Sequence, residues 1–145
     1  MSIAETDRTL IPNADGIRDQ WVARVTELVD QAEEWARELG WATRRIDKRL
    51  DDYELGTHRV PALLLQEGTT RLILEPIGRS AGEIEGVVDL YLMPAYDDAA
   101  RLFFHNGGWH FDFVPAGEAR FTGVDAPLTQ PAFHSLLEEL VRHGA

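Results

Sequence analysis

Alternating apolar and polar positions run through residues 99–114 and predict a β-hairpin. Asn106-Gly107 separates two runs of large apolar residues. This dipeptide favours a type I′ turn, because both central positions of that turn need a positive φ. A two-residue turn here places Arg101 opposite Asp112 and leaves the other face of the hairpin wholly apolar, whereas a three-residue loop would mix the two faces. We therefore expect the two-residue turn.

A second periodicity, with apolar residues three and four positions apart, predicts a long helix from about Ile17 to Leu39. Asp15 is expected to cap its first turn, and Gly40 follows it as a left-handed C′ residue. The apolar stripe consists of Trp21, Val25, Leu28, Ala32, Trp35 and Leu39. The same spacing suits a coiled coil, but three heptads are the minimum for one, so a helix packed on a core is favoured.

The segment 41–53 fits two structures. Ile46, Leu50 and Tyr53 follow a helical spacing, but the glycine stop before them and the strands after them favour an edge strand. Charged residues would also protect such an edge from pairing with another chain. We predict a strand.

Three more strands are expected between this segment and the hairpin. Residues 59–67 and 70–77 carry apolar side chains on both faces, which favours a central position in the sheet, with Pro61 at the start of the first strand. Residues 86–93 form the third strand, and the glycine-containing segment 78–85 is predicted to be a surface loop.

After the hairpin, the sequence predicts one more short strand and a second helix. Residues 118–122 are predicted to form a short edge strand and residues 123–127 a loop. Thr129 is expected to cap a helix over residues 130–142. A long helix, five to seven strands and a shorter helix indicate an α+β fold, with an antiparallel β-meander packed against both helices. The 145 residues suit a single globular domain, with residues 1–13 as a loosely ordered lead-in.

The net charge limits the classes of partner that the protein can bind. The chain has 25 acidic and 14 basic residues and a formal net charge of −11. This argues against binding to nucleic acid or to an anionic membrane surface, and it suits a basic protein partner. The sequence contains no cysteine, no signal-peptide pattern at its start and no apolar run of membrane-spanning length, so we expect a cytoplasmic protein.

The polar face of the hairpin is the first candidate site. Arg101, His105, His110 and Asp112 share this face, and the two histidines are diagonal neighbours close to the turn. Two histidines and a carboxylate are the protein ligands of facial-triad iron sites and of some zinc sites. Because Asp112 faces Arg101 directly, an ion pair is the simpler interpretation, and we predict neither a metal nor another cofactor.

Two further features are candidates. Asp89 and Tyr91 lie on one face of the predicted strand 86–93, beside apolar residues, and such surroundings are typical of general acids. The structural alternatives, which we favour, are an ion pair between Asp89 and an arginine such as Arg71, or exposure of Asp89 to solvent. Trp109, at the hairpin tip, is expected to be partly exposed and could anchor a partner.

The sequence contains no G-x-S-x-G, H-E-x-x-H, P-loop or G-x-G-x-x-G motif. It therefore favours a non-enzymatic protein-binding domain, such as an adaptor, an inhibitor or an immunity-like protein. The alternative is a small-molecule-binding domain or a hydrolytic enzyme, with a site between sheet and helices that uses Asp89, Tyr91 or the histidines. A homodimer through the free sheet face or an edge strand is compatible with both classes.

Overall fold

The computed structural model describes residues 11–79, 85–94, 99–114 and 126–144. Seven strands in this part of the chain form one antiparallel sheet in the order of the sequence, which confirms the α+β meander. In chain order the elements are α2 (Ala14–Glu38), β1 (Ala42–Asp52), β2 (Gly56–Glu67), β3 (Thr70–Gly78), β4 (Val87–Leu92), β5 (Ala99–His105), β6 (Gly108–Val114), β7 (Ala126–Pro127) and α3 (Gln130–Gly144).

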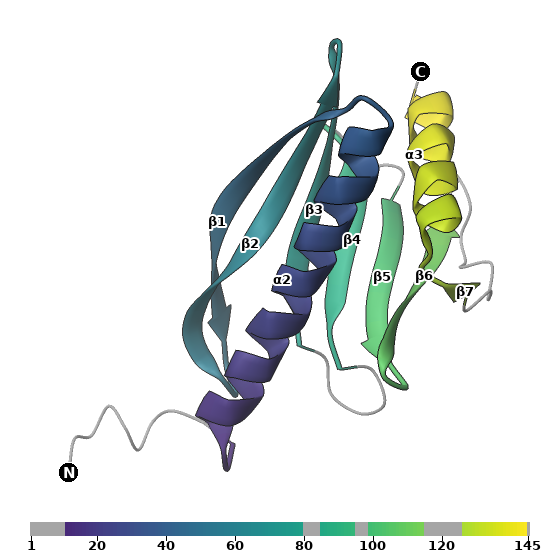
Figure 1. The fold of residues 1–145 in the computed structure, drawn as a ribbon. Helices are drawn as coiled ribbons and strands as arrows, with labels where there is room; N and C mark the ends of the chain where they lie inside the picture. The colour runs from purple at the N-terminus through teal and green to yellow at the C-terminus, as the bar shows by residue number, and fades with distance from the viewer. Residues whose placement is uncertain (1–10, 80–84, 95–98, 115–125, 145) are drawn as a thin grey trace.

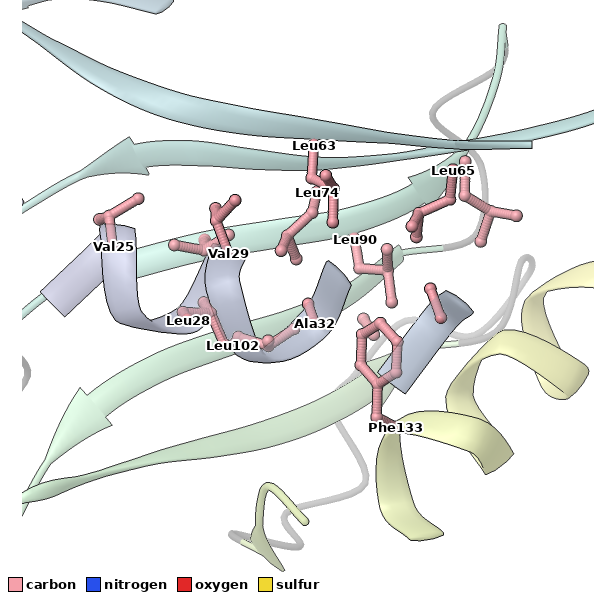
Figure 2. Packing of buried hydrophobic residues seen from close by; sticks show 14 of the residues in the cluster. Val25, Leu28, Val29, Ala32, Leu63, Leu65, Leu74, Leu90, Leu102 and Phe133 are labelled. Carbon is pink, nitrogen blue, oxygen red and sulfur yellow. The ribbon is translucent and has the colours of Figure 1, made fainter. Parts of the chain in front are cut away.

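Both helices lie on the same face of the sheet. Helix α2 crosses this face diagonally, and α3 runs beside it (Figure 1). Between helices and sheet lies a continuous apolar core, in which Val25 and Val29 of α2 face leucines of the sheet (Figure 2). Leu63, Leu74 and Leu90 are fully buried there. Full burial of one such side chain contributes about 1.5–3 kcal/mol, so this layer holds the helices on the sheet.

The opposite face of the sheet carries no helix in the described part of the chain (Figure 1). Neighbouring residues of a strand point to opposite faces. In β4, Val88 and Leu90 belong to the core, so Asp89 and Tyr91 lie on the other side. We call this other side the open face.

The first turn of α2 differs from the prediction. The helix begins at Ala14, and its N-cap is Asn13 in the left-handed conformation (φ 59°), without a capping side-chain hydrogen bond. Asp15 lies inside the first turn instead, where it forms an ion pair with Arg18. A carboxylate in this turn still stabilises the helix dipole. Gly40 follows the helix with φ 88°, as predicted.

Residues 42–52 form the edge strand β1, so the strand prediction for this segment is confirmed. Its partner β2 begins at Gly56, earlier than expected, and Pro61 lies in its interior opposite Asp47. The proline is tolerated because β3 pairs with β2 only from Leu63 onward. At Pro61 the strand therefore has one neighbour, and the missing N–H interrupts no second ladder.

The C-terminal part contains a further difference. Residues 126–127 form the short strand β7 beside β6, where a loop was predicted. The predicted strand 118–122 and most of the predicted loop 78–85 lie outside the described residues. The second helix begins at Gln130, and the backbone N–H of Ala132 donates to Thr129 Oγ1 over 3.3 Å, which confirms the predicted cap.

Three tryptophans contribute to the core between helix and sheet. Trp21 and Trp41 are buried, and Trp35 packs against the core while half-buried. The ring of Trp21 lies so close to Gly86 that a Cβ there would sit 2.4 Å from it. Gly86 also accepts a 2.9 Å backbone hydrogen bond from Phe104. A glycine at this position lets the start of β4 approach α2.

The two-residue turn of the β5–β6 hairpin gives a testable prediction. Asn106 and Gly107 have φ values of 49° and 80°, and a Cβ on Gly107 would meet no atom within 4 Å. Gly107→Ala should therefore lower the free energy of unfolding by about 1–2 kcal/mol through backbone strain alone. Gly108→Ala is the matched control, because that position is equally open and lacks a positive φ. Chemical denaturation of both variants checks this, and equal stabilities would contradict it.

Candidate functional site

The open face of β4, β5 and β6 gathers most of the predicted site residues. The hairpin register is the predicted one, with Arg101 opposite Asp112 and His105 opposite Gly108. Strand alternation places six of the seven predicted residues on this face: Asp89, Tyr91, Arg101, His105, His110 and Asp112. Trp109 alone lies on the other side.

The two histidines form an aromatic cluster with Phe103. The ring centroids of His105 and His110 are 4.1 Å apart, and Phe103 stacks at 5.4 Å from the first ring and 6.1 Å from the second. All three side chains are half-buried. The diagonal contact expected from the register is therefore present, and the rings cover one another near the turn.

Asp89 forms the main ion pair of the open face. Its carboxylate accepts two hydrogen bonds from Arg101, from Nε over 2.9 Å and from an Nη over 3.0 Å. Asp89 is 1% exposed, while the side chain of Arg101 is 43% exposed and covers it. The expected ion pair between Asp89 and an arginine is present, but the arginine is Arg101 on β5 rather than Arg71, because the β3 residue opposite Asp89 is Glu75. These two charge-assisted hydrogen bonds offset the desolvation of the buried carboxylate.

A second polar group adjoins this pair. Glu75 on β3 lies directly opposite Asp89, which places two carboxylates side by side. Glu75 accepts a 2.9 Å hydrogen bond from the Tyr91 hydroxyl and lies 3.1 Å from Lys48 Nζ. Lys48 Nζ also donates to the carbonyl of Pro76 over 2.8 Å. The cation and the phenol offset the repulsion between Glu75 and Asp89.

These surroundings change the acidity of the phenol. Burial, and after it the hydrogen bond to Glu75 and the negative charges of Glu75 and Asp89, raise the pKa of Tyr91 to about 12. Tyr91 therefore stays a neutral hydrogen-bond donor throughout the physiological range. It acts in the structure as the donor that orients Glu75 rather than as an acid or base near pH 7.

The described residues contain no group of three or more His, Asp or Glu side chains placed to hold a metal ion. Trp109 packs against the helix-side core and meets Phe104 edge-on at 5.4 Å. Its half-buried ring thus belongs to the core layer, away from the polar cluster.

Sequence reasoning missed one feature of the open face. A hollow of about 210 Å³ lies where β1 and β3 begin and β2 and β4 end, and Arg44 and Arg71 are among the residues that line it. The two arginines are 27 positions apart, and only the register of three strands brings them together. The sequence pattern of either strand alone contains no signal for such a hollow.

Comparison with known proteins adds no family. No protein-family model matches the chain, and neither a curated protein nor a solved structure is significantly similar to it. In the described part of the chain, no helix combines the length and the apolar character needed to cross a membrane.

The Asp89–Arg101 pair should stabilise the sheet measurably. Arg101→Leu would leave a buried carboxylate without its main partner and should lower the free energy of unfolding by about 2 kcal/mol, less than for a fully buried pair because Arg101 is partly exposed. Arg59→Leu is the control, since Arg59 and Asp47 are both about two-thirds exposed, and should change stability by less than about 0.5 kcal/mol. The double variant Asp89→Asn/Arg101→Leu should lose less than the sum of its single changes. Additive losses would contradict the pairing.

Tyr91 should titrate far from an ordinary phenol. The absorbance difference between the wild type and Tyr91→Phe should show a midpoint near pH 12. In Glu75→Gln this midpoint should fall but stay above 10, because burial remains. Since the folded-state pKa is raised, the stabilisation is complete below pH 10 and is lost as the pH rises toward 12. Unfolding curves of wild type and Tyr91→Phe should therefore converge over this range, and a midpoint near 10 would refute the assignment.

Proposed function

We propose that this protein is a non-enzymatic protein-binding domain that binds a basic protein partner through the outward face of α2. The observation that carries the proposal is the clustering of acidic residues on one side of this helix, where Arg37 is the one basic residue and pairs with Glu33. Its seven acidic residues lie within an arc of about 140°, at 100° per residue, and this arc is centred opposite the buried side. Those residues are Asp15, Asp19, Glu27, Asp30, Glu33, Glu34 and Glu38.

Some of the acidic residues of α2 are paired with arginines, and others are exposed without a basic partner among the described residues. Arg18 pairs with Asp15 and Asp19 near the N-terminus. Glu27 and Glu34 are exposed and form no ion pair with any described residue. They lie seven residues apart, hence on the same side of the helix. A basic surface that approached α2 would meet these two carboxylates without first breaking an existing pair.

The packing of the two layers supports binding over catalysis. The space between helices and sheet is filled by side chains such as Leu28, Leu90 and Phe133, each 1% exposed or less. Asp89 and Tyr91 lie on the open face, so they line no space between the layers. A small-molecule or hydrolytic site between sheet and helices therefore has little support.

The proposed location, the absence of nucleic-acid binding and the possible dimer surfaces follow from charge and composition. A net charge of −11 opposes binding to nucleic acid and speeds the encounter with a basic protein. The absence of cysteine suits the cytoplasm. Two copies of this chain would repel each other through their α2 faces, so a homodimer would have to use the open face or the edge strand β1.

Neutralising Glu27 and Glu34 tests the proposal. Immobilised wild-type protein, exposed to a lysate of the cells that produce it, should retain one basic protein. The affinity of this purified partner for the wild type is then measured by calorimetry. Glu27→Gln/Glu34→Gln should weaken this binding by about tenfold at low salt, and added salt should weaken the wild-type complex in the same way.

Asp47→Asn/Glu67→Gln is the control, because it removes the same charge from exposed positions on β1 and β2. This variant should bind almost as tightly as the wild type. Retention of no basic protein, or equal losses in the two double variants, would refute the role of α2.

A further inference from the structure

Arg44 and Arg71 differ from all other basic side chains that the structure describes. Each of the others lies within 4 Å of a carboxylate: Arg18, Arg24, Arg37, Arg45, Lys48, Arg49, Arg59, Arg79, Arg101 and Arg142. Arg44 and Arg71 form no ion pair and no side-chain hydrogen bond with the described residues, although the chain has 25 acidic residues.

Both of these arginines line the same hollow on the open face. Arg44 lies opposite Leu64 in the β1–β2 ladder, and Arg71 lies opposite Gln66 in the β2–β3 ladder. They are thus two strands and two residues apart, which places their Cα atoms about 12 Å from each other. Two extended arginine side chains can close this distance over Leu64, which lies between them.

The rest of the lining is apolar or already bonded. Leu64 and Met93 are half-buried and form an apolar wall. The hydroxyl of Thr43 is held by Arg37 and Glu33, and the amide nitrogen of Gln66 donates to the carbonyl of Gly68. The two guanidinium groups are the charged groups of the hollow, and neither has a partner among the described residues.

Two cations that have no partner among the described residues favour an anion in this hollow. Each guanidinium presents five N–H donors in a planar fork, whose geometry matches the two oxygens of a carboxylate or of a phosphate group. Like charges placed together repel, and an anion between them removes this repulsion while the apolar wall accepts a hydrocarbon group. An inorganic anion alone would leave Leu64 and Met93 without a contact.

We propose that the hollow binds a small organic anion, in which a carboxylate or a phosphate monoester is carried on a short aliphatic group. Arg44 and Arg71 bind the oxyanion, and Leu64 and Met93 pack against the aliphatic part. The volume of about 210 Å³ is below the 300–1,000 Å³ typical of drug-sized ligands, which limits the ligand to a few carbon atoms beyond the charged group. The site lies on the opposite side of the sheet from the acidic face of α2, so it is independent of the proposed partner.

Titration of the full chain with six-carbon probes tests this site. Hexanoate or hexyl phosphate should shift the backbone amide NMR signals of Arg44, Leu64, Arg71 and Met93 in a saturable way, and the tighter of the two identifies the oxyanion. Hexanol should cause no saturable shift, because it lacks the charge. Arg44→Gln and Arg71→Gln should each weaken binding by about tenfold, as expected for the loss of hydrogen bonds to a charged group.

Arg59→Gln is the matched control, since Arg59 is an exposed arginine of β2 outside the hollow and pairs with Asp47. It should leave the affinity for the probe unchanged. Melting temperatures near that of the wild type show that the variants remain folded, as expected for substitutions at exposed positions. The absence of saturable shifts with both anions, equal binding of hexanol, or unchanged affinity in Arg44→Gln and Arg71→Gln would each overturn the proposal.

Discussion

The packing of α2 on one face of the sheet is the constraint on which the rest of the structure depends. Each strand alternates its side chains, so the choice of a buried face for one residue decides the side of every other residue in that strand. Leu90 enters the core under α2, and Asp89 and Tyr91 must therefore lie on the open face. Hydrophobic burial therefore decides which polar side chains lie on each side of the sheet.

Local signals allowed the hairpin to be predicted in full. Asn106-Gly107 favours a two-residue turn, and the clean separation of the two faces excludes a three-residue loop. Once the turn is set, the pairing of Arg101 with Asp112 and the neighbouring positions of His105 and His110 follow by counting. The edge position of residues 42–52 could also be predicted, because charge on an edge strand has a physical reason. These features depend on residues that are close in the sequence or on a strong period.

Features that depend on the pairing of distant strands were not predictable in the same way. The partner of Asp89 is Arg101 rather than Arg71, because the β4–β5 register places Arg101 opposite it and β3 places Glu75 there. The interior position of Pro61 depends on where β3 stops pairing with β2. The prediction of Asp15 as the N-cap was also wrong. Asn13 adopts a left-handed conformation and is the N-cap, so the helix begins at Ala14 and Asp15 lies in its first turn.

The same one-sided packing separates two kinds of charge. Among the described residues, the carboxylates without a basic partner include Glu27 and Glu34 on the outward side of α2. The described arginines without an acidic partner, Arg44 and Arg71, lie on the open face of the sheet. A sheet with a filled core between these sides keeps the opposite charges from neutralising each other. An acidic surface on one side and a cationic hollow on the other can then persist in a chain of net charge −11. The acidic side of α2 therefore suits the proposed basic protein partner, and the hollow at Arg44 and Arg71 suits the proposed small anion.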